Sequence, residues 1–303
     1  MGSRMCNNLI AKTKPDSTVY VYDSYQPSLT EAASNGAVAV DSVADLSAHC
    51  DVIITMLRSD EQVHSVYSQI LSKTLKDDAL LIDSSTVNYL TSRDIAAKIP
   101  STASILDAPV SGGIGAAAAG SLTFMCGGNQ ATYERAKAVL GTMGMNVFHC
   151  GEEHGSGQIA KICNNLILAI SMCGVSEGMN LGVKLGMDPQ KLAEIVNVST
   201  GRCWSSDQYN PCPGVTLLDA EGNPKLVPAK NNYDGGFVVD LMRKDLGLAL
   251  DAAKGADAGT PLGASVAQLY DMIAHRGFGN KDFGFIYQFV KGGETMEGKA
   301  YGA

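Results

Sequence analysis

The chain has 303 residues, 45% of them hydrophobic and 18% charged, which is an ordinary composition for a water-soluble globular protein with one or two domains. Its formal net charge of −8 at pH 7 and its scattered Lys and Arg residues argue against a nucleic-acid-binding surface. Polar residues interrupt the apolar runs before they reach membrane-spanning length, so we expect no membrane partner. The eight cysteines and five histidines show no zinc-ligand spacing, so we expect no bound metal.

The first half of the chain alternates short β-rich runs with helical patterns, which is typical of a doubly wound parallel sheet with helices on both faces. Predicted strands lie at residues 18–22, 52–56, 79–83, 104–107, 122–126 and 146–149. Predicted helices lie at residues 5–13, 28–35, 42–47, 60–67, 89–97 and 130–143.

The strand signals stop after about residue 155, and the second half predicts helices joined by loops. These helices lie at residues 158–185, 189–200, 239–254, 261–276 and 283–290. Residues 209–234 are rich in Pro, Gly and Asn and predict a loop. We therefore expect a dinucleotide-binding α/β domain over residues 1–153 and an all-α domain for substrate binding and oligomerisation over residues 154–303.

The run HGSGQIAKICNN at residues 154–165 places a glycine-rich turn before a long apolar helix. Lys161 and Asn165 are four residues apart and therefore share one face of that helix. Burial disfavours the charged form of a lysine, so a lysine on a helix of this kind needs a partner or a task. The alternative is a solvated lysine on an amphipathic helix.

Several strand ends in the first half carry side chains suited to a nucleotide. Residues 19–23, VYVYD, form a strand ending in Asp23, whose carboxylate suits ribose hydroxyls, and the absence of a following Arg favours NAD over NADP. Hydroxyl side chains end the strands near Thr55 and Asp83, where they either contact the cofactor or cap the next helix. Ser111, Gly112 and Gly113 leave backbone N–H groups open to an anion, with a plain tight turn as the alternative.

The motifs at residues 107–113, 155–165 and 244–249 occur in the order and spacing of the β-hydroxyacid dehydrogenase family, which this chain resembles over nearly its whole length. The resemblance implies a Rossmann-type sheet domain followed by a helical domain. Residues 201–215 are similar to the segment of family members that oxidise 3-hydroxyisobutyrate. Residues 216–230 form a longer insert than in those members.

The resemblance also implies a role for each matching position. The implied catalytic residues are Lys161 and Asn165. The implied substrate-binding residues are Ser111, Gly112, Gly113 and Lys244. The implied cofactor-binding residues are Gly2, Asp23, Leu57, Arg58, Gln62, Thr86 and Lys244. Arg58 stands where the family often has a proline.

The implied reaction is the oxidation of 3-hydroxyisobutyrate to methylmalonate semialdehyde with NAD, a step of valine breakdown. The alternatives are an NADPH-dependent reductase of another small semialdehyde and a non-catalytic nucleotide-binding isoform. Trp204, Tyr209 and Phe237 either wall the small substrate pocket or pack in the core. We expect a homodimer or homotetramer. The resemblance implies a mitochondrial protein. The cytoplasm is the alternative, because the chain shows no targeting pattern.

The first five residues, MGSRM, match the end of the glycine-rich cofactor signature of the family. The resemblance therefore implies that the first strand and the first two glycines of that signature are missing. We expect a dinucleotide-binding domain that is incomplete at its N-terminus, because that strand is central in a doubly wound sheet.

Overall fold

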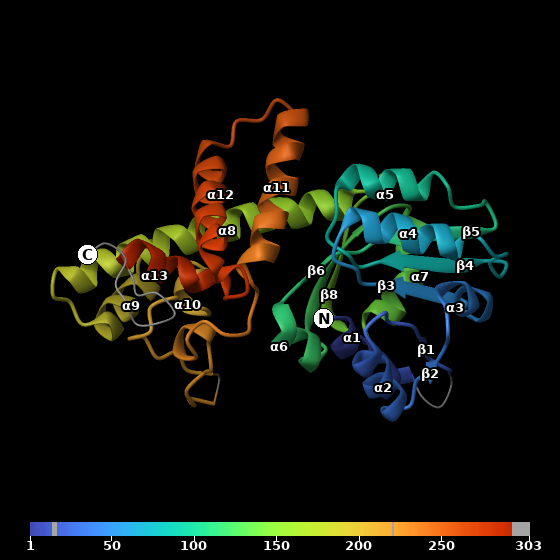
Figure 1. Ribbon diagram of the computed structural model, residues 1–303, viewed down its shortest axis with the longest axis horizontal. Helices are drawn as coiled ribbons and strands as arrows, with labels where there is room; N and C mark the ends of the chain where they lie inside the picture. Colours follow the sequence, from blue (N-terminus) through green and yellow to red (C-terminus); the bar gives the residue numbers. More distant parts are fainter. Residues whose placement is uncertain (14–16, 220, 293–303) are drawn as a thin grey trace. The chain divides into compact units, whose positions relative to one another are not determined.

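The computed structural model describes residues 1–13, 17–219 and 221–292 (Figure 1). Residue 220 of the predicted loop and residues 293–303 of the predicted helical domain lie outside the described residues. The chain divides into two compact units, Met1–Lys161 and Ile162–Ala303. The domain boundary predicted between residues 153 and 154 stays a prediction.

Unit 1 contains two sheets. Two short parallel strands, β1 (Tyr20–Val21) and β2 (Val38–Ala39), form the smaller sheet. The larger sheet has six strands in the order β3-β4-β5-β7-β6, with β8 also paired to β7. Its strands are β3 (Val52–Thr55), β4 (Ala79–Asp83), β5 (Ala103–Asp107), β6 (Val110–Ser111), β7 (Leu122–Gly127) and β8 (Gly144–Gly151).

The larger sheet is mixed, which corrects the expectation of a wholly parallel sheet. Strands β3, β4 and β5 are parallel, whereas β7 runs antiparallel to both β5 and β6. The connection from β6 to β7 is too short for the crossover that a parallel pair requires, so the chain turns back on itself. The β8 strand then pairs with β7 in parallel after the intervening helix α7.

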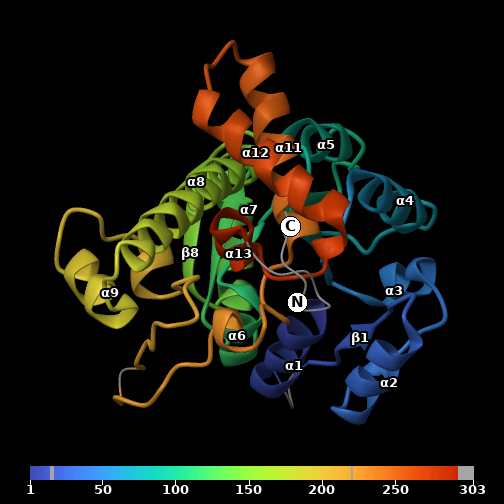
Figure 2. The same cartoon turned by 60° about the vertical axis from the view of Figure 1, so that its left-hand side comes forward.

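Helices cover both faces of the larger sheet (Figure 1; Figure 2). They are α1 (Gly2–Thr13), α3 (Val43–His49), α4 (Asp60–Ile70), α5 (Tyr89–Ala96), α6 (Gly113–Ala119) and α7 (Gln130–Leu140). The helix α2 (Gln26–Ser34) packs instead with the smaller sheet. On β4, Leu81 packs with α3, α4 and α5, while Leu80 and Ile82 pack with α1, α6 and α7. Every residue of β4 is buried, because successive side chains enter two different cores.

The 29-residue helix α8 (Ser156–Lys184) begins within unit 1 and continues into unit 2. Its length and apolar composition alone satisfy the criterion for crossing a membrane, a criterion that buried core helices of soluble proteins also meet. The expectation that there is no membrane partner stays a prediction.

Unit 2 consists of helices joined by loops, with two isolated β-bridges among its described residues. Its helices after α8 are α9 (Pro189–Asn197), α10 (Trp204–Asp207), α11 (Val239–Gly255), α12 (Pro261–Ile273) and α13 (Ile286–Lys291). The predicted helix 261–276 loses its α-helical geometry after Ile273, because Gly277 adopts a φ of 90°. The short helices α6 and α10 were not predicted, since four to seven residues carry too little periodicity.

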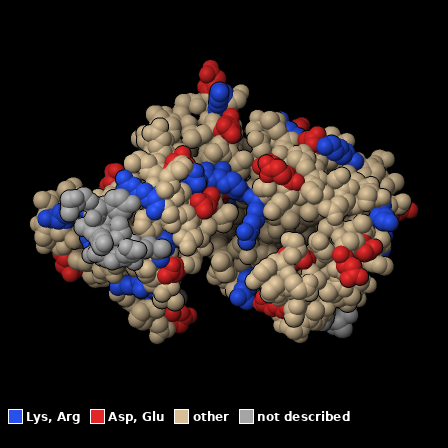
Figure 3. All heavy atoms as spheres, viewed as in Figure 1, with Lys and Arg blue, Asp and Glu red and all other residues tan. Residues whose placement is uncertain are grey.

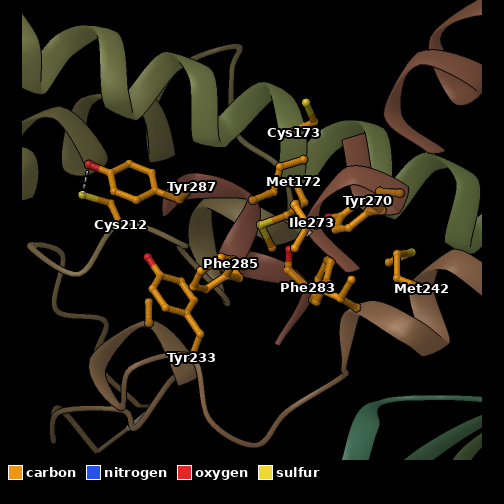
Figure 4. Close-up of a cluster of buried hydrophobic side chains, with 14 of the residues drawn as sticks. Met172, Cys173, Cys212, Tyr233, Met242, Tyr270, Ile273, Phe283, Phe285 and Tyr287 are labelled. Atoms are coloured by element: carbon orange, nitrogen blue, oxygen red, sulfur yellow. Dashed lines mark hydrogen bonds between the residues drawn. The ribbon is translucent and has the colours of Figure 1, made fainter. Parts of the chain in front are cut away.

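An aromatic and sulfur-rich core holds unit 2 together (Figure 4). Tyr270, Phe283 and Met172 lie in this cluster, with side chains almost fully removed from solvent. The phenol of Tyr270 donates to the carbonyl of Phe283, and the Cys212 thiol donates to the Tyr287 oxygen at 3.3 Å. Acidic and basic side chains are interspersed with uncharged surface on the face shown in Figure 3.

Candidate active site

Two buried carboxylates end neighbouring strands of the larger sheet. Asp83 and Asp107 are partners in the parallel register of β4 and β5, so both lie at the carboxyl edge of the sheet. Asp83 accepts hydrogen bonds from the Thr55 hydroxyl at 2.8 Å and from the Ser85 hydroxyl at 2.6 Å. Neither carboxylate was singled out from the sequence, although strand-terminal Asp residues in adjacent strands are a detectable signal.

Burial is the main electrostatic feature of both carboxylates. It raises the pKa of Asp83 above the usual range, against the lowering effect of the Ser85 and Thr55 hydrogen bonds. Burial also raises the pKa of Asp107 to about 7, opposed by the backbone N–H groups of Gly155 and Gln158. A small cavity lies against both carboxylates and is also lined by Ser92 and His154.

The candidate catalytic lysine is buried. Lys161 is 8% exposed and Asn165 is 1% exposed, and both belong to α8. Their spacing of four residues places them on one face of the helix, as the sequence predicts. The solvated-lysine alternative is therefore wrong, because this side chain has left bulk water.

In unit 2, Asp245 of α11 holds Asn165 in place. The Asn165 Nδ2 donates to Asp245 Oδ2 at 2.5 Å, and the carboxylate is itself buried. The Lys244 Nζ lies 3.2 Å from the other oxygen of Asp245, so Lys244 and Asn165 share this one carboxylate. Asp245 lies within the motif at residues 244–249, but the sequence alone assigns it no role. An acidic residue directly after Lys244 is the signal that could have identified it.

The predicted carboxylate-binding loop joins β6 to α6. Ser111 ends β6 and α6 begins at Gly113, with positive φ angles of 134° at Gly112 and 69° at Gly113. A Cβ on Gly112 would lie 2.6 Å from the Cβ of Ala116, so both geometry and space require glycine at this position. The turn thus presents backbone N–H groups without side chains over them, which suits an anion.

Three of the predicted cofactor-binding residues come together after β3. The Leu57 N–H donates to the Ser85 hydroxyl at 2.8 Å, and the Arg58 N–H donates to the Gln62 side chain at 3.0 Å. Thr86 follows Ser85 at the end of β4, which neighbours β3. These residues lie at the carboxyl edge of the parallel strands, where ligands bind in open α/β sheets.

The start of α1 lies beside the same edge and is positively charged. A Cβ on Gly2 would lie 3.8 Å from the Met56 side chain, just before Leu57. Burial lowers the pKa of the Met1 amino group, and the charges of Arg4 and Arg58 lower it further. Positive charge at a helix N-terminus fits a pyrophosphate.

Asp23 lies in the loop after β1 and is exposed. One of its carboxylate oxygens accepts the backbone N–H of Tyr25 at 2.9 Å, which fixes the side chain while its surface stays open. An exposed carboxylate at this position fits the ribose hydroxyls of NAD. The residues of unit 1 therefore suit a dinucleotide along the edge of the sheet.

The three aromatic residues considered for the substrate pocket belong to one aromatic cluster in unit 2. Trp204 stacks on Tyr209 with ring centroids 4.9 Å apart, and Tyr209 stacks on Phe283 of the core at 5.7 Å. Phe237 meets Phe283 edge to face at 5.9 Å. Tyr209 and Phe237 therefore pack against the core, while Trp204 stays half exposed.

The carboxyl edge of the parallel strands in unit 1 suits a dinucleotide, and we call it the nucleotide edge. The helix α8 carries a buried lysine and leads from this α/β unit into a helical unit. These features together define a two-domain NAD-binding oxidoreductase. Residues 1–151 match the family model described as the NAD binding domain of 6-phosphogluconate dehydrogenase. Residues 155–290 match the model described as NAD-binding of NADP-dependent 3-hydroxyisobutyrate dehydrogenase. The chain belongs to the 3-hydroxyisobutyrate dehydrogenase family, which confirms the resemblance and the fold class predicted from the sequence.

The relatives match over almost the whole chain. The mitochondrial 3-hydroxyisobutyrate dehydrogenase of Bos taurus is 45% identical over 98% of this chain and 85% of its own length. The 3-hydroxyisobutyrate dehydrogenase of Pseudomonas aeruginosa is 41% identical over 96% of both chains. The solved Mycobacterium tuberculosis 3-hydroxyisobutyrate dehydrogenase with L-serine is 35% identical over 96% of both chains, with a TM-score of 0.86.

Proposed function

We propose that this chain oxidises 3-hydroxyisobutyrate to methylmalonate semialdehyde with NAD, as a step of valine breakdown. The observation that carries the proposal is the buried Lys161 on α8, followed one turn later by Asn165. The substrate named for the relatives supports this choice. L-serine, named with the solved relative, is likewise a 3-hydroxy carboxylic acid.

The turn at Ser111, Gly112 and Gly113 binds the substrate carboxylate. Its positive φ angles and bare backbone support this role, because N–H groups there have no side chain to exclude an anion. Binding the carboxylate orients the hydroxymethyl group, and orientation of this kind supplies much of the advantage of an enzyme over solution.

Lys161 acts as the general base and removes the proton of the substrate hydroxyl. In the reverse direction it returns that proton to the carbonyl oxygen of the semialdehyde. Asn165 orients the reacting oxygen without adding charge, and its bond to Asp245 fixes the direction of its amide. Lys244 adds a positive charge for the substrate or cofactor and is held by the same Asp245.

Gly2, Asp23, Leu57, Arg58, Gln62 and Thr86 hold the cofactor. NAD, when bound, accepts the hydride from the hydroxymethyl carbon. Asp23 favours NAD over NADP, because a carboxylate attracts ribose hydroxyls and repels a 2′-phosphate. Arg58 is exposed and lies near the start of α1, where its charge supports binding of the pyrophosphate.

The direct test is steady-state oxidation of 3-hydroxyisobutyrate, followed by the absorbance of the reduced cofactor, with NAD and NADP in parallel. We expect turnover with NAD and a much lower kcat/KM with NADP. Faster reduction of tartronate or succinate semialdehyde with NADPH would replace the proposal with the reductase alternative. NAD binding without turnover of any hydroxyacid would favour the non-catalytic isoform.

The active form is a homodimer or homotetramer. Support comes from the exposed apolar side chains that follow one another along α8 and beyond it, at Ile167, Leu181 and Leu185. Gly174 and Gly178 lie on the same exposed stretch of α8 with open space beside them, which permits close approach of a second helix. Light scattering on the purified protein tests this assignment, and a monomer at micromolar concentration contradicts it.

We place the protein in mitochondria, with the cytoplasm as the alternative. The relatives from Bos taurus and Homo sapiens carry a mitochondrial name, whereas the Pseudomonas aeruginosa relative is bacterial. Fractionation of cells that express the endogenous protein distinguishes the two compartments.

A further inference from the structure

The first turn of α8 is capped by a carboxylate from a different element. The Gly155 N–H donates to Asp107 Oδ1 at 2.7 Å, and the Gln158 N–H donates to Asp107 Oδ2 at 3.2 Å. The first N–H groups of a helix have no partner within the helix, so a buried helix start needs acceptors from elsewhere. Asp107 supplies them from the end of β5, where its negative charge also meets the positive end of the helix dipole.

Gln158 ties the same turn to the strand ends that carry the cofactor-binding residues. Its side-chain Nε2 donates to the Ser85 carbonyl at 2.9 Å, and its Oε1 accepts the Val87 N–H at 3.2 Å. The Ser85 hydroxyl in turn accepts the Leu57 N–H and donates to Asp83. A continuous set of buried and partly buried hydrogen bonds therefore runs from Leu57 to the start of α8.

Two glycines let these elements approach closely. A Cβ on Gly127 of β7 would lie 2.7 Å from Asp107 Oδ1 and 2.6 Å from the backbone nitrogen of Gly157. A Cβ on Gly157 would lie 2.8 Å from Asp107 Oδ2 and would collide with the Met125 carbonyl oxygen. The helix start therefore packs directly against β5 and β7, where the absence of side chains at these two positions permits the close approach.

We infer that Asp107, acting with Gln158, is the positioning residue for Lys161: it fixes the first turn of α8 to the nucleotide edge of the sheet. The inference rests on the proposed catalytic role of Lys161. Lys161 follows Gln158 by three residues, less than one helical turn, so a shift of this turn moves the lysine with it. A displacement of about 1 Å costs on the order of 100-fold in rate.

The test is Asp107→Asn, which keeps the size of the side chain but turns one acceptor into an N–H₂ facing a backbone donor. The matched control is Asp60→Asn. Asp60 accepts the Asn88 N–H at 2.9 Å and the Thr91 hydroxyl at 2.6 Å, so it likewise holds a helix start, that of α5, from another element of unit 1. The substrate is 3-hydroxyisobutyrate, either unlabelled or deuterated at the hydroxymethyl carbon.

For Asp107→Asn we expect kcat to fall roughly 10- to 100-fold with an unchanged KM for NAD. We also expect a larger deuterium isotope effect on kcat, because a misplaced base makes the chemical step limiting. A merely structural role reduces the amount of active enzyme and leaves the isotope effect unchanged, which is the result expected for Asp60→Asn. The inference is overturned if the two variants lose the same activity with the parental isotope effect.

Gln158→Met is the second variant. If Asp107→Asn does not fold, this variant tests whether the contacts of the first turn of α8 position Lys161. It removes both side-chain bonds while the backbone N–H to Asp107 remains, and the inference expects the same rise in the isotope effect. An unchanged isotope effect in Gln158→Met contradicts the inference. Lys161→Ala is measured alongside: if that variant keeps full activity, the proposed function fails, whatever Asp107→Asn does.

Discussion

The two units hold the same helix through different chemistry. In unit 1 a carboxylate, Asp107, accepts the backbone N–H groups of Gly155 and Gln158 at the start of α8. In unit 2 a carboxylate, Asp245, accepts the Asn165 amide and lies beside the Lys244 ammonium. Burial raises the pKa of Asp107 to about 7, because backbone donors offset only part of the cost of removing its charge from water. The charge of this buried carboxylate therefore depends on pH near neutrality.

The largest expected effect is that of replacing Lys161, which follows the turn held by Asp107 and precedes Asn165 along α8. Lys161→Ala should lower kcat by roughly 100- to 10,000-fold, the usual range for loss of a general base. Lys184, exposed in the last turn of the same helix, offers the control. Lys184→Ala should leave kcat unchanged. Equal kinetics for the two variants would remove Lys161 from the mechanism.

The second-largest effect is expected from removing the Asp245 carboxylate of unit 2. Asp245→Ala should lower kcat about 10- to 100-fold, because Asn165 loses the acceptor that fixes its amide. It should also destabilise the protein by about 2 to 4 kcal/mol, since Lys244 and Asn165 lose a buried partner.

A double-mutant cycle shows whether Asp245 acts through Asn165. If it does, Asn165→Ala combined with Asp245→Ala should be no slower than the slower single variant. Fully additive losses in kcat would show that the two side chains act independently.

Replacing Asp23 of unit 1 should change the preference for NAD over NADP rather than the rate of the reaction. Asp23→Ser should raise the ratio of kcat/KM for NADP over NAD by roughly 10-fold, because it removes the carboxylate that repels a 2′-phosphate. Asp51→Ser, at an exposed position just before β3, is the control and should leave the ratio unchanged. No change in either variant would separate Asp23 from cofactor choice.

The pH dependence of stability tests the Asp107 carboxylate of unit 1 directly. The folded pKa of Asp107, about 7, lies above its ordinary value of 3.8, so the folded state binds the proton more tightly than the unfolded state. Its stabilising contribution is therefore present below pH 3.8 and is lost as pH rises to about 7. Between about pH 5 and 8 we expect the free energy of unfolding of the wild type to fall by about 2 to 3 kcal/mol relative to that of Asp107→Asn.

Denaturant titrations of the two proteins across this pH range make the measurement. Asp282 of unit 2, whose pKa burial raises to about 6, contributes with the same sign in both proteins and cancels in the difference. Parallel pH curves for wild type and Asp107→Asn would show that Asp107 titrates normally.

The smallest effect is expected at an ordinary helix cap. Asp188 accepts the Lys191 N–H at 2.8 Å at the start of α9, on the surface of unit 2. Asp188→Ala should cost about 1 kcal/mol with unchanged kcat and KM, because α9 carries none of the proposed catalytic residues. A loss of kcat in this variant would mean that any cap, buried or exposed, affects the reaction.

The sequence by itself determined the larger part of this architecture. The continuous apolar run of β4 and the long apolar helix α8 are both visible as local patterns in the sequence. Their positions along the chain can therefore be predicted from the sequence alone. The spacing of Lys161 and Asn165 on one helical face is equally local. The family resemblance is likewise visible in the sequence, because three motifs occur in the order and spacing typical of the family. The strand β6 has only two residues and is defined by its pairing with β7 rather than by a local pattern, so the sequence does not predict it. The helix α6 is too short to show a helical period.

Only the tertiary structure decided which groups hold these residues in place. Asp107 precedes Gln158 by 51 residues, and Asn165 precedes Asp245 by 80 residues, yet each pair is hydrogen-bonded. No local period links such positions, since their meeting depends on the packing of β5 and α11 against different parts of α8. The same packing sets the burial that shifts the Asp107 pKa, because the cost of a charge depends on the surroundings that the folded chain provides.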